Sequence, residues 1–385
     1  MKYCILFFRK CWNRFFGSYP WRVLSFKNIL EHRDLMEPHG TVAPQSLAGV
    51  LYEENSPPFH LKESISLLEG QTIRKEYVGS WPRHIQKGLV PSYQRKVMLL
   101  NQAGVLGDEG WIYCRRTRSL IRESAELWST SASNNPILGT VRGFEPRRLE
   151  GLSLMLSARG SSGFYHFLIE TLPKWKLLKE WAGDANHILV PGCSGSFHAA
   201  WLQHAGIPMD KCIFLNGCSH LHCDQLAYSS ATMGDQMPDE WTILTLRDMF
   251  HQPTKTAGRF LWISRKNASA RHLSWENKLL SKLPSFEMID TCKITPPEQI
   301  AAVVSASAIV APHGAGLALA AFLNPFARVV ELFPDQSFQH PLYARLCHAA
   351  GVEHRWASLP FEKEPEHLED ITEKIESFIE ARPAL

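Results

Sequence analysis

The sequence predicts an α/β protein in which helices cover parallel β-sheets, and three observations support this. Hydrophobic residues make up 45% of the 385 residues and charged residues 21%, a composition typical of a folded chain with a core. In the second half, short apolar runs alternate with segments of helical period, which indicates parallel strands joined by crossover helices. The length exceeds the ~150 residues of an average domain and predicts two domains or one large one.

We expect three parts along the chain. Residues 1–95 form an N-terminal extension that is rich in Pro, His and Arg and lacks a clear period, 96–236 form a first α/β domain, and 237–385 form a second. The polar segment 252–258 carries proline and glycine and is typical of a linker.

Apolar runs in the first domain predict six strands and two helices. The strands are expected at 97–100, 111–114, 152–157, 187–191, 212–215 and 222–228. The helices are expected at 164–181, which follows a glycine- and serine-rich turn at 159–163, and at 197–205. Pro173 should either kink the first helix or make it restart with Thr171 as its cap. Gly206 can end the second helix as a left-handed residue.

The second domain alternates between strands and helices with little ambiguity. Strands are expected at 259–264, 286–289, 308–311 and 329–332, and helices at 240–250, 275–283, 317–323, 342–350 and 366–379. A further helix should begin at Thr295, which forms a capping box with Glu298. Gly351 can end the helix expected at 342–350. The last helix carries one apolar and one acidic face.

The charge and cysteine content exclude several classes of protein. The formal net charge of +3 is too small to predict nucleic-acid binding. Nine cysteines, an odd number, fit free thiols in a reducing compartment such as the cytoplasm better than a disulfide framework. The densest group comprises Cys212, Cys218, His220, His222 and Cys223. It lacks the paired spacing of a zinc site, which favours structural thiols over a metal.

The N-terminal segment is basic and aromatic. Residues 1–33 carry seven Lys or Arg side chains against one acid, Glu31. The apolar run at 3–8 is shorter than the ~7–15 residues of a signal-peptide core, and the sequence has no apolar stretch of ~20 residues that would span a membrane. The segment therefore suits a peripheral contact with a membrane surface, and a basic arm packed on the domain fits it equally well.

The strongest chemical feature is a glycine loop at His313, Gly314, Ala315, Gly316 and Leu317. It follows an apolar strand and opens a helix, so it should lie at the carboxyl edge of a parallel sheet, where ligands bind. Small residues let the backbone approach a ligand closely, and amides at a helix start attract phosphate. A plain tight turn is the alternative. Leu319 stands where a dinucleotide fingerprint needs its third glycine.

Two further groups have side chains suited to binding or proton transfer. Ser264 and Arg265 end a strand and Arg271 follows; arginine forks suit a diphosphate, although surface charge beside a loop explains them as well. His166 and Glu170 stand four residues apart on one helix face, a spacing at which a carboxylate can orient an imidazole base. From spacing alone, an ordinary intrahelical pair is the better explanation.

Several catalytic motifs are missing from the sequence. It contains no G-x-x-x-x-G-K-[ST] phosphate loop and no H-E-x-x-H zinc motif. The segment 192–196 fails the nucleophile-elbow pattern G-x-S-x-G at its last place. No D-x-D pair is present to hold a metal–diphosphate complex.

The three features occur in the order of the motifs of a known family. The family's N-Y-x-H-W-L-x-D-x-L-P is matched at 163–173, its Y-I-S-R and later acid at 262–276, and its glutamine helix, H-G-A-G-L and E-L at 299–332. Over residues 150–335 the chain thus resembles the glycosyltransferase 61 family, once described as capsular polysaccharide biosynthesis proteins. It departs from the family at Gly163, Glu170 and Ala318-Leu319.

The resemblance implies a GT-B fold, in which two Rossmann-like domains face a cleft, and inverting transfer of a hexose or pentose from a nucleotide sugar, usually a UDP-sugar. GT-B enzymes generally work without a bound metal or permanent cofactor. The donor diphosphate would then be held by Ser264, Arg265, Arg271 and the loop from His313 to Leu317, and Glu331 would bind the ribose. His166, supported by Glu170, would be the base that faces the donor from the acceptor-side domain.

We therefore expect a transferase that builds a cell-surface polysaccharide, a glycolipid or a glycoprotein glycan. It would be cytoplasmic, with residues 1–33 at the inner face of the membrane, and its partners would be the donor and a glycan acceptor. One alternative is a non-catalytic nucleotide-binding subunit of a glycan assembly complex. Another is a nucleotide-dependent epimerase or dehydrogenase, against which the incomplete G-x-G-x-x-G pattern counts.

Overall fold

The computed structural model describes residues 22–24, 48–56, 59–60, 65–68, 89–90, 93–116, 119–121, 124, 145–192, 196–230, 238–250, 258–268, 270–335 and 341–381. The chain divides into two compact units. Unit 1 comprises Met1–Ser56 and Gln94–Asp235, and unit 2 comprises Pro57–Tyr93 and Gln236–Leu385. The expected linker lies outside the described residues except for Gly258, and the basic N-terminal segment lies outside them except for Arg22–Leu24.

Unit 1 is built on a nine-stranded sheet in the order β1-β8-β7-β6-β12-β9-β10-β11, with β2 also paired to β6. The strands are β1 (Arg22–Leu24), β2 (Ala48–Ser56), β6 (Tyr93–Leu106), β7 (Trp111–Cys114), β8 (Ser119–Ile121), β9 (Arg147–Met155), β10 (His187–Val190), β11 (Cys212–Phe214) and β12 (His220–Ser229). Strands β12, β9, β10 and β11 are mutually parallel.

The expectation of a wholly parallel sheet is wrong for unit 1, because β6, β7 and β8 form an antiparallel meander that continues to β12. Strand β6 runs on to Leu106, so the connection to β7 is a four-residue turn. Gly107 and Gly110 have φ values of 72° and 69° in that turn. A turn this short can join only antiparallel neighbours.

The helix expected at 164–181 is broken into three pieces. They are the π-helical η4 (His166–Thr171), the α-helix α6 (Lys174–Leu178) and the 3₁₀ helix η5 (Lys179–Trp181). The break falls at Pro173, as expected, because proline has no N–H to donate and its ring crowds the preceding turn. Thr171 does not cap the restart: it lies inside η4, and Pro173 occupies the cap position.

The other helices of unit 1 agree better with the sequence. Helix α7 (Phe197–His204) is followed by Gly206 with a φ of 72°, so its expected glycine stop is confirmed. A short 3₁₀ turn, η6 (Met209–Lys211), leads into β11.

Unit 2 contains the parallel sheet that the sequence predicts. Its order is β14-β13-β15-β16-β17-β4, and every pairing is parallel. The strands are β13 (Arg259–Ile263), β14 (Phe286–Ile289), β15 (Ala306–Pro312), β16 (Arg328–Pro334), β17 (Glu353–Leu359) and β4 (Ile65–Ser66). The sequence analysis missed β17 and β4. Two more short strands, β3 (Phe59–His60) and β5 (Leu89–Val90), form a separate antiparallel ribbon.

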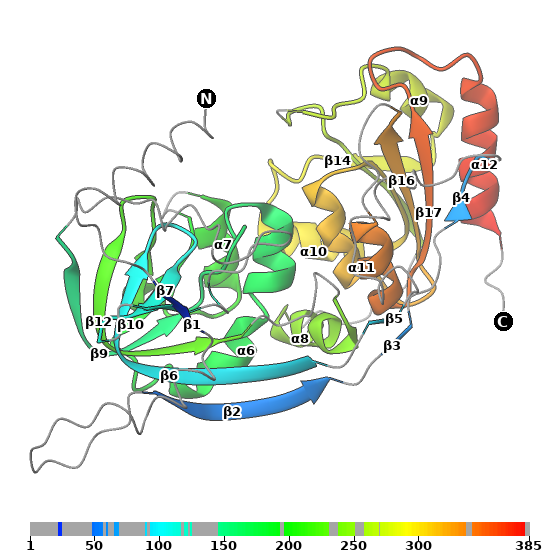
Figure 1. The fold of residues 1–385 in the computed structure, drawn as a ribbon. Helices are drawn as coiled ribbons and strands as arrows, with labels where there is room; N and C mark the ends of the chain where they lie inside the picture. The colour runs from blue at the N-terminus through cyan, green and yellow to red at the C-terminus, as the bar shows by residue number, and fades with distance from the viewer. Residues whose placement is uncertain are drawn as a thin grey trace, which may run out of the picture. The chain divides into compact units, whose positions relative to one another are not determined.

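Helices cover both faces of this sheet, as Figure 1 shows for α11 and α12 on either side of β16 and β17. The helices are α8 (Glu240–Phe250), α9 (Glu276–Lys282), α10 (Pro296–Val304), α11 (Leu342–Ala350) and α12 (Leu368–Glu380). The capping box of Thr295 and Glu298 is present. The helix expected at 317–323 is a 3₁₀ helix, η7 (Ala315–Phe322), rather than an α-helix, and α8, α10 and α11 pack around it.

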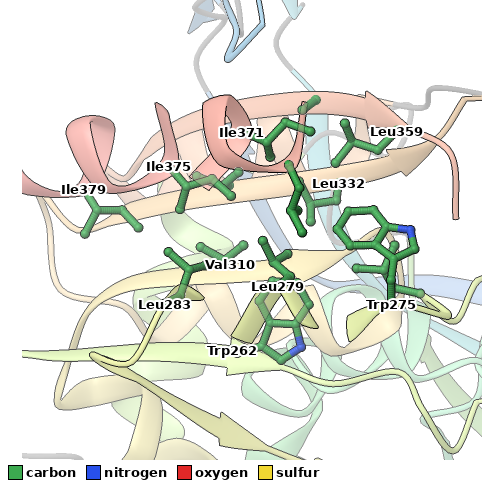
Figure 2. Packing of buried hydrophobic residues seen from close by; sticks show 14 of the residues in the cluster. Trp262, Trp275, Leu279, Leu283, Val310, Leu332, Leu359, Ile371, Ile375 and Ile379 are labelled. Carbon is green, nitrogen blue, oxygen red and sulfur yellow. The ribbon is translucent and has the colours of Figure 1, made fainter. Parts of the chain in front are cut away.

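The apolar face predicted for the last helix covers the sheet core. Ile371, Ile375 and Ile379 point from α12 toward Leu332 and Val310 on the strands, and the nearby Trp262 is fully buried (Figure 2). Helix α9 packs on the same cluster and contacts α12. Full burial of each such side chain contributes about 1.5–3 kcal/mol, so this layer stabilises the packing of α9 and α12 on the sheet.

Two further properties concern cysteines and membrane spans. All six cysteines within the described ranges are free thiols. In the same part of the chain, no helix is long and apolar enough to cross a membrane.

Gly351→Ala should lower the free energy of unfolding by about 1 kcal/mol. Gly351 ends α11 with a φ of 72°, a conformation that costs an L-residue roughly this amount. Urea denaturation would measure the change. Gly183→Ala is the matched control, because Gly183 has an ordinary φ and open space around its Cα; equal destabilisation by the two substitutions would contradict the explanation.

Candidate active site

The strand order of unit 2 brings two loops together at one point. Strand β13 pairs with β14 on one side and with β15 on the other, so the chain reverses its direction of winding between β13 and β15. Crevices at the carboxyl ends of strands that flank such a reversal are the usual ligand sites of open parallel sheets. The loop after β13 carries Arg265 and Arg271, and the loop after β15 begins with His313 and Gly314.

Arg265 and Gly314 lie in close contact. A Cβ atom added at Gly314 would overlap the Arg265 guanidinium. The φ of Gly314 is 169°, which is extended backbone, so glycine is needed here for space and not for an unusual conformation. Gly316 is similarly close to Ile263, with 2.9 Å from its would-be Cβ to Ile263 Cγ2. The β15 loop therefore packs directly against the end of β13.

The charge of Arg265 is incompletely compensated. Its Nη2 donates to the Ala270 carbonyl at 3.0 Å. Its Nε is buried and has no hydrogen-bond partner among the described residues. Burial and the nearby charge of Arg271 lower the pKa of Arg265, although an arginine remains protonated at any physiological pH. Two neighbouring cations with an orphaned donor form a site for an anion.

Ser264 supports the loop through two hydrogen bonds of its hydroxyl group. Its hydroxyl donates to Glu276 Oε2 at 2.8 Å and accepts the Lys266 backbone N–H at 3.2 Å. The other oxygen of Glu276 accepts the Trp262 indole N–H at 2.7 Å. Glu276, the acid of the second family motif, is buried. It thus fixes the strand end from which Arg265 projects.

His313 belongs to a buried row of three side chains on neighbouring strands. Its Nδ1 donates to Glu331 Oε1, and His354 Nε2 donates to Glu331 Oε2 at 3.0 Å. Ring contacts add to these bonds, since His313 stacks on Phe333 with 4.8 Å between centroids and meets Tyr343 edge-on at 5.4 Å. The imidazole of His313 is therefore held in one orientation.

Glu331 remains ionised although it has no exposed surface. Burial alone would raise its pKa, but the charge of His313 and hydrogen bonds from both histidines bring the pKa below its usual value. Burial and the Glu331 charge raise the pKa of both Tyr343 and Cys347. The resemblance implied a direct contact between Glu331 and the ribose. With an exposed fraction of 0% and both oxygens bonded to imidazoles, Glu331 offers no accessible atom for it.

The second candidate group, His166 and Glu170, is assembled in unit 1. Both side chains project from η4, and Nδ1 of His166 donates to Oε1 of Glu170 at 2.8 Å. This bond assigns the proton to Nδ1, because a carboxylate can only accept, and makes Nε2 the proton-accepting nitrogen. Single π-helical turns such as η4 occur frequently at functional sites.

Sequence analysis missed two cations near Glu170. Lys174 is buried at the start of α6, and its pKa is lowered to about 8 by burial, against the attraction of Glu170. Burial also lowers the pKa of Arg159, while Glu109 and Glu170 act in the opposite direction. The spacing of four residues from Glu170 to Lys174 was a usable signal. Arg159 has no comparable signal, because the turn that brings it close is not a regular element.

The cysteine- and histidine-rich group does not converge. His220 and His222 instead contact the Tyr113 hydroxyl through their Nε2 atoms at 2.8 and 2.9 Å, and Cys223 is buried in the core. Burial and the charges of Arg115 and His220 lower the pKa of His222 to about 4. Within the described ranges, no three His, Cys, Asp or Glu side chains gather as metal ligands.

A family comparison confirms the resemblance seen in the motifs. Residues 164–330 match the model of the family described as Glycosyltransferase 61. The chain carries a glycosyltransferase 61 domain. The protein is therefore a glycosyltransferase, which separates it from an epimerase or dehydrogenase on a similar sheet. The matched segment contains the His166 pair, Arg265, Arg271 and the His313 loop, while Glu331 and His354 lie beyond its end. No curated protein matches the sequence.

Lys174→Met should stabilise this glycosyltransferase at neutral pH. A folded-state pKa of about 8 against 10.5 means that the buried ammonium costs up to about 3 kcal/mol. As pH rises from about 8 to 10.5 the folded wild type releases this proton before the unfolded chain does, so its stability increases. The advantage of Lys174→Met should shrink over the same range. Chemical denaturation at several pH values would measure it.

Lys176→Met is the control for this prediction, because Lys176 lies exposed on the same helix. A pH-independent gain, or an equal gain for Lys176→Met, would contradict a buried ammonium at position 174.

Proposed function

We propose that the protein is an inverting, metal-independent glycosyltransferase that moves a sugar from a UDP-sugar to a hydroxyl group of a polysaccharide, glycolipid or glycoprotein glycan. The observation that carries the proposal is the contact of Arg265 with Gly314 at the reversal point of the unit 2 sheet, beside Arg271 and His313. This arrangement offers two cations, an unpartnered donor and closely approachable backbone to one anionic ligand.

The donor diphosphate would lie over the Gly314–Gly316 backbone. Arg265 and Arg271 would neutralise its charge with their planar forks of donors. These charges also support the reaction, because negative charge accumulates on the diphosphate as the bond to the sugar breaks. The cations thus supply the stabilisation that a D-x-D-bound metal supplies in other transferases, and the sequence has no D-x-D pair.

His313 would donate a hydrogen bond to the same diphosphate from Nε2. Its Nδ1–H is committed to Glu331, so Nε2 is the ring nitrogen that remains for the ligand, and a ring that carries both protons donates from both nitrogens. In this proposal Glu331 and His354 are positioning residues that act through His313. The Glu331 carboxylate would therefore assist the leaving group rather than bind the ribose.

His166 would act as the base for the acceptor hydroxyl. The hydroxyl oxygen attacks the anomeric carbon, its proton passes to Nε2 of His166, and the sugar–phosphate bond breaks with its electron pair leaving on UDP. The configuration at the anomeric carbon is inverted by this single displacement. Glu170 would stabilise the imidazolium that forms, as carboxylates do behind other histidine bases.

The remaining parts of the proposal come from the family resemblance and the N-terminal composition. They are a GT-B arrangement of the two units, a cytoplasmic location, and contact of the basic segment 1–33 with the inner face of a membrane.

UDP should raise the melting temperature of the wild type but not of Arg265→Ala or Gly314→Ala. A ligand at about 100 times its Kd adds about 2.7 kcal/mol. A Cβ at position 314 would displace the far end of a flexible side chain, so Gly314→Ala should lose UDP binding without a large loss of stability. The UDP shift should survive EDTA.

Gly258→Ala is the control for Gly314→Ala, since nothing lies within 4 Å of its would-be Cβ. An unchanged UDP shift in Arg265→Ala would exclude Arg265 from the donor site, and a shift with NAD alone would argue against a nucleotide-sugar donor.

His166→Ala should lower kcat for sugar transfer by about 10²- to 10⁴-fold, the usual contribution of a general base, and should leave the UDP-induced stabilisation intact. Glu170→Gln should lower kcat by a smaller factor. Transfer would be followed as UDP release from a UDP-sugar with an acceptor glycoside. Full activity in His166→Ala would remove His166 from the mechanism.

A further inference from the structure

Unit 1 contains a cavity of about 240 Å³ that the proposed mechanism does not use. Its lining combines the polar side chains of Asp108, Glu109, Ser162 and Asn216 with Pro191, Leu215 and the two glycines Gly192 and Gly217. Ser162, Gly192 and Asn216 follow β9, β10 and β11 respectively, so the cavity lies at the carboxyl ends of the parallel strands of this unit. That edge is where parallel sheets bind ligands, and the volume is just below the ~300–1,000 Å³ of typical small-molecule sites.

The walls of the cavity are fixed before any ligand binds. Gly192 has a φ of 84° and packs against His198, whose ring fills the space of a Cβ. His198 is buried and bridges two loops, with Nδ1 2.9 Å from Ser196 Oγ and Nε2 2.8 Å from the Ser161 carbonyl oxygen. The loops after β9 and β10 therefore hold one relative position. Gly217 leaves the opposite wall open, since nothing lies within 4 Å of its would-be Cβ.

The hydrogen-bonding groups of the cavity suit hydroxyl groups. Asp108 Oδ1 accepts the Glu109 N–H and Glu109 Oε1 accepts the Gly160 N–H, both at 3.1 Å. Among the described residues, neither carboxylate uses its second oxygen in a hydrogen bond, so these two oxygens are the acceptors that the proposal assigns to a ligand. Asn216 Oδ1 accepts the Cys218 N–H at 2.9 Å. The amide nitrogen of Asn216 is therefore the group that can donate to a ligand. Carboxylate acceptors combined with an amide donor match a polyol, whereas two carboxylates repel an anionic ligand.

The cavity and the His166–Glu170 pair share one turn. Ser162 lines the cavity, and the next residue, Gly163, has its would-be Cβ 3.8 Å from His166 Cδ2. The Gly163 carbonyl accepts the Phe167 N–H at the start of η4. Arg159 in the same turn interacts electrostatically with both Glu109 and Glu170. A ring seated in the cavity would therefore lie beside the histidine that the mechanism needs as a base.

We propose that this cavity binds the acceptor sugar ring, and that it selects an uncharged ring over a uronate or a phosphorylated sugar. This inference rests on the proposed transferase function. It adds the class of acceptor and the side chains that recognise it, Asp108, Glu109 and Asn216.

The test uses the full-length protein and two series of methyl glycosides. The neutral series contains glucoside, galactoside, mannoside and N-acetylglucosaminide, and the anionic series contains glucuronide and mannoside 6-phosphate. Saturation-transfer NMR in the presence of UDP should show binding of at least one neutral glycoside and weaker binding of the anionic ones. Asp108→Asn and Asn216→Ala should each weaken binding of the neutral ligand about tenfold, because the first removes the charge from one hydrogen bond and the second removes a hydrogen bond altogether.

Asp184→Asn is the control, because Asp184 is an exposed acid of unit 1 outside the cavity. The double variant Asp108→Asn/Glu109→Gln should admit the glucuronide, which simple damage to the fold would not produce. Equal binding in the cavity variants, tighter binding of the anionic series, or no neutral ligand at all would overturn the acceptor site while UDP stabilisation persists. Loss of UDP stabilisation in the wild type would instead overturn the proposed function.

Discussion

The buried carboxylate of Glu331 is the interaction on which the organisation of unit 2 depends. An ionised group with no exposed surface costs several kcal/mol unless it is paired, and Glu331 is paired twice, with His313 and with His354. Glu331 and His354 lie on the adjacent strands β16 and β17, and His313 directly follows β15, the other neighbour of β16. The charge therefore ties the strand that ends in the glycine loop to its two neighbours. Rotation of His313 would leave one carboxylate oxygen without a partner.

A second constraint is the lack of a side chain at Gly314. Unlike Gly351, whose backbone is left-handed, Gly314 has extended backbone that any residue can adopt. What it provides is room for Arg265. The hydrogen bond from the Ser264 hydroxyl to Glu276 also holds the Arg265 loop in place. Together these contacts fix a cation at a backbone loop before a ligand arrives, and such preorganisation is the main source of electrostatic stabilisation in enzymes.

Local signals in the sequence predicted much of this structure. Helix α8 and strand β14 have the expected bounds, and the capping box at Thr295 and the stop at Gly351 are where the residue types require them. The connection between the strands expected at 97–100 and 111–114 is shorter than predicted. Strand β6 continues to Leu106 through residues of mixed polarity, because these residues pair with β7 and β12. Strand β4 is beyond local prediction, since its partner lies 290 residues away.

The candidate active site was likewise predictable only where local sequence determines it. Ordered motifs pointed to His166, Arg265 and the His313 loop, which all lie within residues 164–330, the segment that the family model matches. They did not reveal which atoms face a ligand. Ser264 turned out to brace its loop and Glu331 to support a histidine, because both depend on partners, Glu276 and His354, from other elements. His354 carries no motif of its own, and only the pairing of β16 with β17 places it beside Glu331.

The two candidate subsites differ in the sign of their charged side chains, and the difference matches the proposed chemistry. In unit 2, Arg265 and Arg271 concentrate positive charge at the sheet edge; in unit 1, the cavity exposes the carboxylates of Asp108 and Glu109. A transfer from a nucleotide sugar separates a strongly anionic leaving group from an uncharged acceptor. In the proposed reaction, the cations of one subsite and the carboxylates of the other would direct the two substrates to different places, because the diphosphate would be attracted to the first and repelled by the second. Both groups of charges would then favour productive binding over the binding of UDP at the proposed acceptor subsite.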